Sequence, residues 1–226
     1  MQRYSIANLV WQGLRKNAGW RPAWGEPKLK PNYDVVIIGG GGHGLATAYY
    51  LAKEHGITNV AILEKGWIGG GNTGRNTTVV RSDYLFPESA ALYDLSLQLY
   101  EAASRDLNFN IMLSQRGYMT LIHNQHQMES AHHKVNWLAC NGVDGEIIDL
   151  PELQRMVPLL NVSESSRNPV RGAFLQRRGG TIRHDAVAWG FARAASARGV
   201  DIVQRIAERN SPALARTVTR TSSAEK

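Results

Sequence analysis

The stretch "YDVVIIGGGGHGLATAYYLAKEHG", residues 33–56, constrains the fold more than any other part of the sequence. It opens with a continuous apolar, β-branched run, passes through four consecutive glycines and continues with apolar residues at helical spacing. A run without polar alternation predicts a strand buried on both faces, as in a parallel sheet. "NVAILE", residues 59–64, predicts a second such strand, so the segment forms a right-handed βαβ unit.

The glycines at the first strand-to-helix junction form a G-x-G-x-x-G motif from Gly39, Gly41 and Gly44, with Gly42 near the helix start. Glycine permits the unusual backbone angles of the turn and lets a pyrophosphate approach the main chain. Glu64 follows Gly44 by twenty residues and is placed to accept hydrogen bonds from ribose hydroxyls. The pattern favours a dinucleotide site over a simple glycine-rich connection between packed elements. It does not distinguish FAD from NAD as the ligand.

Strand and helix patterns alternate through the rest of the chain to residue 204, which predicts an α/β fold with helices flanking a sheet. The segment 65–78 is too rich in glycine to predict regular structure. The expected helices are 88–104, 125–142, 151–158 and 184–199, and the expected strands are 117–123, 145–150, 172–178 and 200–204.

The second glycine-rich segment carries polar side chains soon after Glu64, namely Asn72, Arg75, Asn76 and Thr77. An arginine with amide and hydroxyl groups is suited to contact a pyrophosphate or a bulky ring system. A flexible surface loop explains the same residues equally well, and the residues alone do not decide between the two.

The net charge of +7 is concentrated at the two ends of the chain. Residues 1–32 contain six basic residues and one acidic residue, and residues 205–226 contain five and two, so residues 33–204 have a net charge of −1. This distribution argues against nucleic-acid binding, which needs a basic recognition face. The basic N-terminal extension either docks on an acidic partner subunit or is a solvated arm.

Cys140 is the only cysteine, which excludes an internal disulfide and a cysteine-built metal site. No apolar run reaches membrane-spanning length, and the first residues lack the pattern of a secretory signal. Together these features predict a cytoplasmic protein that binds no membrane.

Four blocks together resemble the FAD-dependent amine oxidases of the D-amino-acid-oxidase group: "YDVVIIGGGGHGLATAYYLA", "LEKG", "GGNTGRNTT" and "RRGGTIRHDAVAWGFARAA". The resemblance is strongest to the beta subunits of heterotetrameric bacterial sarcosine oxidases. It implies a Rossmann-like FAD-binding domain of the glutathione-reductase type, with part of an α+β substrate domain. By this resemblance, non-covalent FAD is held by Gly39, Gly41, Gly42, Gly44, Glu64, Lys65, Asn72, Arg75, Asn76 and Thr77.

The block Arg183–His184–Asp185 matches the position at which this family carries covalent FMN, through the 8α-methyl carbon of the flavin. The resemblance therefore assigns covalent FMN to His184, and a neutral imidazole has the required nucleophilicity. Nearby Arg177, Arg178 and Arg183 are candidates to hold its phosphate. From the residues alone, His184 reads as a solvent-facing residue of a first helical turn. Asp185 is expected to cap that helix or, alternatively, to orient the histidine ring.

The resemblance also implies a reaction and partners. Sarcosine is demethylated to glycine, the one-carbon unit leaves as formaldehyde or is captured by tetrahydrofolate, and electrons pass through FMN to oxygen to give hydrogen peroxide. An alpha subunit that carries NAD, with gamma and delta subunits, completes the assembly.

Family members continue for nearly as long again after the equivalent of Gln204, so we expect this chain to lack a C-terminal half that holds the substrate-binding residues. No catalytic residue is therefore assigned. The alternatives are an inactive flavin-binding remnant or another FAD-dependent amino-acid oxidase of the same group. The expected organisation is a basic extension (1–32), the FAD-binding domain in two parts (33–105 and 171–204) around a partial substrate domain (106–170), and a divergent, disordered tail (205–226).

Overall fold

The computed structural model describes residues 5–19, 23–25 and 27–206, and the expectation of a disordered tail lies almost wholly outside them. The chain forms two compact units, one from Met1–Gly70 with Phe191–Lys226 and the other from Gly71–Gly190. The boundary near residue 190 falls within a helix. Among the described residues, no helix has both the length and the apolar character needed to cross a membrane.

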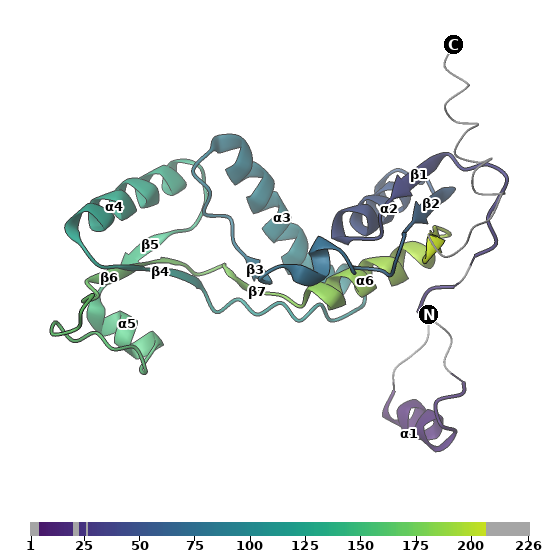
Figure 1. The fold of residues 1–226 in the computed structure, drawn as a ribbon, viewed down its shortest axis with the longest axis horizontal. Helices are drawn as coiled ribbons and strands as arrows, with labels where there is room; N and C mark the ends of the chain where they lie inside the picture. The colour runs from purple at the N-terminus through teal and green to yellow at the C-terminus, as the bar shows by residue number, and fades with distance from the viewer. Residues whose placement is uncertain (1–4, 20–22, 26, 207–226) are drawn as a thin grey trace, which may run out of the picture. The chain divides into compact units, whose positions relative to one another are not determined.

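The first unit is built on a three-stranded parallel sheet with the order β1-β2-β8 (Figure 1). The β-branched runs form its strands as expected, and Val36 lies opposite Ala61, which in turn lies opposite Asp201. Its elements are α1 (Ile6–Leu14), β1 (Val35–Ile38), α2 (Gly42–Glu54), β2 (Val60–Leu63), the C-terminal part of α6 (His184–Ser196) and β8 (Asp201–Val203).

Helices α2 and α6 contribute aromatic rings to the core of the first unit. Tyr49, which is 1% exposed, lies edge-on to Phe191 with 5.5 Å between ring centroids. Leu45, Val60 and Ile62 are completely buried around the sheet. Burial of large side chains of this kind is the main stabilising contribution in a small α/β unit.

Strand β1 is the edge of this sheet, since among the described residues it pairs only with β2. Its first three residues are half-buried, and Ile38 at its end is 77% exposed. Strands of parallel sheets are normally covered on both faces. The apolar run of β1 therefore lacks part of the cover that its sequence predicts.

The second unit contains an antiparallel sheet with the order β4-β6-β5 and a two-stranded antiparallel ribbon of β3 and β7. All five residues of β6 are buried at the centre of its sheet. The elements are η1 (Asn72–Arg75), β3 (Val79–Val80), α3 (Pro87–Asp106), β4 (Tyr118–Ile122), α4 (Gln125–Cys140), β5 (Glu146–Ile148), α5 (Leu150–Met156), β6 (Gly172–Gln176), β7 (Gly180–Thr181) and the start of α6.

Alternate residues of β6 face opposite sides of the sheet, and a different helix covers each side (Figure 1). Ala173 and Leu175 belong to a cluster with Leu153 of α5. Phe174, between them, packs with Leu138 of α4. The sheet is therefore buried on both faces around β6, as its sequence "GAFLQ" requires.

The expected helices and strands are all present with small shifts at their ends, and the structure adds four elements. Helix α1, strands β3 and β7 and the single 3₁₀ turn η1 were not expected. The prediction of no regular structure at 65–78 is wrong for η1, where Gly74 N–H donates to the Gly71 carbonyl at 3.2 Å.

Candidate cofactor-binding sites

The turn between β1 and α2 has the geometry expected of a phosphate-binding loop. Gly39 adopts a left-handed φ of 106°, which disfavours any side chain. A Cβ on Gly44 would overlap the Gly39 carbonyl oxygen and lie 3.2 Å from Cγ2 of Ile37. Glycine is therefore required at Gly44 for the close packing of α2 on β1.

The N-terminus of α2 is suited to bind an anion. Gly41 is its N-cap residue and provides no side-chain capping bond, and the first turn contains no acidic residue. The backbone N–H groups and the positive end of the helix dipole are thus directed at the turn, and the first turn of the helix adds no carboxylate of its own. This observation fits the pyrophosphate of a dinucleotide.

Glu64, at the end of β2, is bound to the same turn. Its Oε2 accepts the Gly40 N–H at 2.7 Å, and its Oε1 accepts the Gly66 N–H at 2.8 Å. Each carboxylate oxygen can accept more than one hydrogen bond, so both remain able to receive ribose hydroxyls. The structure thus joins Glu64 to Gly40 and Gly66, two contacts beyond the ribose role expected from the sequence, and Lys65 follows as an exposed residue.

The loop after Glu64 depends on a residue that sequence reasoning missed. Gln204, directly after β8, accepts the Ile68 N–H with its side-chain oxygen at 2.9 Å. The Gly69 N–H donates to the Gly40 carbonyl, also at 2.9 Å. The position of Gln204 at the carboxyl end of a parallel strand is the signal that could have identified it.

The second glycine-rich loop lies in the other unit, and its candidate residues Asn72, Arg75, Asn76 and Thr77 are all exposed. Asn76 uses its side chain within the loop: Nδ2 donates to the Thr73 carbonyl at 2.7 Å, and Oδ1 accepts the Thr78 N–H at 2.8 Å. Asn76 therefore shapes the loop, while Arg75 presents its guanidinium to solvent.

His184 is the first residue of α6. Its Nδ1 is buried and has no hydrogen-bond partner, although the residue as a whole is only half-buried. An unpartnered buried nitrogen is costly unless another group satisfies it. This observation fits a bound group that completes the environment of the ring.

Asp185 holds Arg183 and a helix N–H rather than the histidine ring. Its oxygens accept from Arg183 Nε at 3.0 Å and Nη2 at 2.6 Å, and Oδ1 also accepts the Ala186 N–H at 2.9 Å. The hydrogen bonds from Arg183 hold the pKa of Asp185 below its ordinary value. The structure thus favours the helix-start role expected of Asp185 over orientation of His184.

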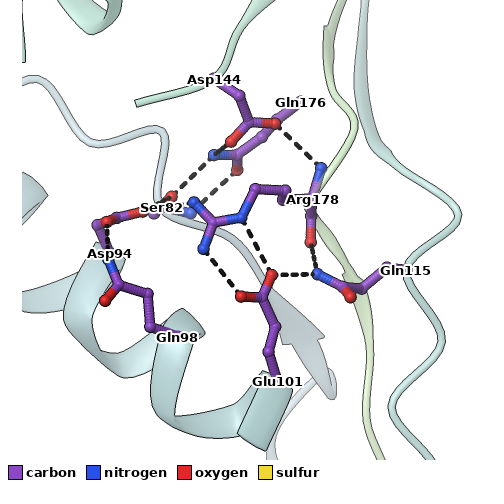
Figure 2. Close-up of polar contacts among 8 residues, drawn as sticks. All are labelled: Ser82, Asp94, Gln98, Glu101, Gln115, Asp144, Gln176 and Arg178. Atoms are coloured by element: carbon purple, nitrogen blue, oxygen red, sulfur yellow. Dashed lines mark hydrogen bonds and ion pairs between the residues drawn. The ribbon is translucent and has the colours of Figure 1, made fainter. Parts of the chain in front are cut away.

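The arginines before His184 are engaged with carboxylates. Arg177 is paired with Glu146 and Glu152. The side chain of Arg178 forms hydrogen bonds to Glu101 and Asp94, both on α3 (Figure 2). A phosphate would have to compete with these carboxylates. The ion pairs of Arg177 and Arg178 therefore stabilise the second unit.

Figure 2 shows that Arg178 belongs to a larger polar network. Its backbone N–H donates to Asp144 Oδ2 at 3.0 Å, and Asp144 Oδ1 accepts from Gln176 Nε2 at 3.2 Å. Gln176 is fully buried and exchanges two hydrogen bonds with Ser82, at 3.0 and 2.8 Å. The network joins α3, β6 and the segment after β3.

A buried ion-pair cluster around Asp83 was also missed from the sequence. The side chain of Asp83 is 0% exposed; it accepts from Arg81 Nη1 at 2.7 Å and contacts Lys134 Nζ. The guanidinium of Arg81 lies 4.8 Å from the Tyr84 ring centroid and 4.7 Å from that of Tyr118.

Among the described residues, no group of three or more His, Cys, Asp or Glu could hold a metal ion.

Comparison with known proteins identifies relatives of this chain. Residues 34–225 match the family DAO, FAD dependent oxidoreductase, and this match extends past Gln204. The chain is 54% identical over 202 residues to the sarcosine oxidase subunit beta of Rhizobium meliloti (strain 1021), covering 89% of the chain and 48% of the relative. It is 50% identical over 181 residues to the protein of the same name from Arthrobacter sp, covering 80% and 45%.

A solved structure shares the fold. The L-proline dehydrogenase from P.horikoshii superposes with a TM-score of 0.71 at 26% identity, covering 78% of this chain and 45% of that one. The chain thus spans about half the length of the relatives that it matches.

Proposed function

Because the chain belongs to the DAO family of FAD dependent oxidoreductases, we propose that it is part of a sarcosine oxidase beta subunit. The observation that carries this proposal is the 54% identity over 202 residues to a protein of that name. An alignment that covers 89% of the chain spans the strand, turn and carboxylate of the proposed dinucleotide site. The proposed reaction is the oxidative demethylation of sarcosine, with water and oxygen, to glycine, formaldehyde and hydrogen peroxide; tetrahydrofolate is the alternative acceptor of the one-carbon unit.

In the proposed assembly, FAD is held without a covalent bond by the turn Gly39–Gly44 and by Glu64. The N-terminus of α2, whose first turn has no acidic residue, binds the pyrophosphate, and Glu64, already fixed by Gly40 and Gly66, binds the ribose. Lys65, Asn72, Arg75, Asn76 and Thr77 are proposed as further contacts. When bound, the flavin supplies the redox chemistry, and the protein contributes binding, orientation and exclusion of water.

We place covalent FMN at His184, because its buried Nδ1 has no hydrogen-bond partner in the described chain. Arg183 is the arginine closest in sequence and is exposed, so it remains available to an anion if its pair with Asp185 opens. The partners of this subunit are proposed to be an alpha subunit that carries NAD, with gamma and delta subunits, in the cytoplasm. The substrate-binding residues are proposed to lie in the part of the relatives that this chain does not cover.

The exposed edge of the parallel sheet favours a second candidate, an inactive remnant that binds flavin without turnover. Ile38 is 77% exposed where the family fold needs a covered strand. A third candidate, oxidation of another amino acid, is supported by a 35% identity to the glycine oxidase of Bacillus subtilis (strain 168), although over only 82 residues.

A complementation experiment separates these candidates. The chain is produced alone and together with a second polypeptide that supplies the other half of a sarcosine oxidase beta subunit, and each preparation is mixed anaerobically with sarcosine or glycine. We expect sarcosine, but not glycine, to bleach the flavin of the complemented protein. Neither substrate should bleach the isolated chain. Bleaching by glycine but not sarcosine would establish the third candidate, and bound flavin that no substrate bleaches would establish the second.

A further inference from the structure

Helix α1, in the basic N-terminal extension, is apolar on most of its surface and none of its residues is buried. Ser5 caps it by accepting the Asn8 N–H at 3.2 Å. An isolated helix of nine residues is shorter than the roughly 12–15 residues that are stable alone in water. Its five large apolar side chains are half to four-fifths exposed: Ile6 82%, Leu9 50%, Val10 59%, Trp11 58% and Leu14 76%.

The polar side of α1 is occupied by the chain itself. Asn8 and Gln12 are the only polar side chains within the helix, and their spacing of four residues places them on one face. The Asn17 N–H donates to the Gln12 carbonyl at 2.7 Å, and a Cβ on Gly19 would overlap the Gln12 side chain. The segment after the helix therefore covers the polar face and leaves the apolar face outward.

The charges around α1 favour a protein partner over a lipid surface. A helix that binds a membrane surface carries lysine or arginine along its polar face, whereas α1 contains no charged residue. Arg15 and Lys16 follow its C-terminus, where they complement the negative end of the helix dipole and a partner's carboxylates. Apolar residues at positions i, i+3, i+4 and i+8, as in Ile6, Leu9, Val10 and Leu14, are typical of a helix that binds in a groove.

The extension lies outside the family match, but part of it is aligned with proteins that are named as subunits. The family match begins at residue 34. The matches to two sarcosine oxidase beta subunits cover 89% and 90% of the chain, which is more than residues 34–226 alone provide. Part of the extension is therefore aligned with these subunits, and residues 33–204 have a net charge of only −1.

We propose that α1 is a docking helix that places its apolar face in a groove of a different subunit, bordered by carboxylates near Arg15 and Lys16. The proposal rests on the proposed function for the existence of companion subunits, and adds the segment and the chemistry by which one of them is bound. The net charge of +5 on residues 1–32 strengthens the association with an acidic groove and makes it sensitive to salt.

The test is co-purification of the tagged chain with its companion alpha, gamma and delta subunits. We compare wild type with Leu9→Gln, on the apolar face, and with Asn8→Gln, which introduces the same residue on the polar face next to it. We expect Leu9→Gln to weaken the association at least tenfold and Asn8→Gln to change it less than twofold. FAD content, measured in the same samples, should be equal in all three, because α1 precedes the dinucleotide turn.

Photo-crosslinking identifies the occupant. With p-benzoylphenylalanine in place of Trp11, we expect crosslinks to an acidic segment of one companion subunit. Crosslinks only to the same chain or to a second copy would overturn the proposal. Sedimentation of the wild-type chain with phosphatidylserine vesicles, if Leu9→Gln abolishes it, would also overturn the proposal, because it would establish α1 as a membrane anchor. If the Leu9→Gln variant forms the same complex as wild type, the docking role of α1 is overturned and the proposed assembly is not. If the wild-type chain retains FAD but binds no companion subunit, both the docking role and the proposed assembly are overturned.

Discussion

Glu64 joins the end of β2 to the glycine turn through Gly40, whose N–H donates to Glu64 Oε2 at 2.7 Å. The other oxygen accepts the Gly66 N–H, so one carboxylate fixes the backbone on both sides of the proposed ribose site. A Cβ on Gly40 would lie 3.1 Å from the Glu64 Cβ, which shows how closely the two residues pack. In the proposed FAD site, ribose binding and the stability of the turn therefore depend on the same side chain.

Replacement of Glu64 by alanine should weaken FAD binding at least tenfold and lower the free energy of unfolding by about 1–3 kcal/mol, because two backbone N–H groups lose their acceptor. Glu54→Ala, at an exposed position at the end of α2, is the matched control and should change the unfolding free energy by less than about 0.5 kcal/mol. FAD titration by fluorescence quenching and thermal unfolding measure the two effects. Equal FAD affinity in Glu64→Ala and Glu54→Ala would contradict the role proposed for Glu64.

Gly44→Ala should destabilise the first unit by about 1–3 kcal/mol, because the new methyl group would overlap the Gly39 carbonyl oxygen. Gly25→Ala is the control, since a methyl group at Gly25 would meet no atom within 4 Å beyond its chain neighbours. Urea unfolding followed by circular dichroism compares the two variants. If both have the same midpoint as wild type, the close packing of α2 on β1 is incorrect.

An element of this structure can be predicted from the sequence when neighbouring residues alone determine it. The strands at Val35–Ile38 and Val60–Leu63 and helix α2 follow from runs of neighbouring residues, so their ends were predicted to within two residues. The ribbon of β3 and β7 pairs Val79 with Thr181, and two-residue strands carry no pattern of their own. Their existence depends on contacts between distant segments.

The same distinction applies to the candidate sites. Glu64 was identified as a candidate because the glycine motif and the end of the next strand belong to one βαβ unit, but its hydrogen bond to Gly40 was not predicted. The partners of Arg178 on α3 lie 84 and 77 residues away, and only the fold reveals that its guanidinium is already paired. Helix α1 was missed because its apolar residues are exposed and resemble those of an irregular extension.

Stability of the second unit should fall in acid through Glu101. Hydrogen bonds from Arg178, together with one from Gln115, hold the pKa of Glu101 below its ordinary value, and partial burial opposes them. A carboxylate with a lowered pKa contributes stability above its ordinary pKa of about 4.3 and loses that contribution as the pH falls through its folded-state pKa.

Glu101→Gln should therefore lower the unfolding free energy by about 1 kcal/mol at neutral pH, a value moderated by solvent exposure of the pair, and by progressively less below about pH 4. Glu88→Gln, at an exposed position in the first turn of the same helix, is the control. Denaturant titrations of all three proteins between neutral and acidic pH provide the measurement. A constant difference between wild type and Glu101→Gln across that range would contradict the ion-pair explanation.

The exposed end of β1 should make the chain prone to self-association, because an uncovered strand edge with apolar side chains is a site for pairing. Ile38→Thr keeps a β-branched residue and should reduce aggregation while changing the unfolding free energy by less than about 0.5 kcal/mol. Ile62→Thr, at a completely buried position of the adjacent strand, should instead cost about 2 kcal/mol or more. Light scattering and unfolding midpoints test both, and equal effects of the two substitutions would show that β1 is covered.

Acid precipitation of the holoprotein, purified with its companion subunits, tests the proposal that two separate parts of this chain bind two different flavins. We predict FAD in the supernatant and FMN in the pellet, on the peptide that contains His184. His184→Ser should remove the pellet flavin and retain the soluble FAD, whereas His133→Ser, at an exposed position of α4, should change neither. A wild-type pellet without flavin, or a single kind of flavin in the whole preparation, would contradict the proposal.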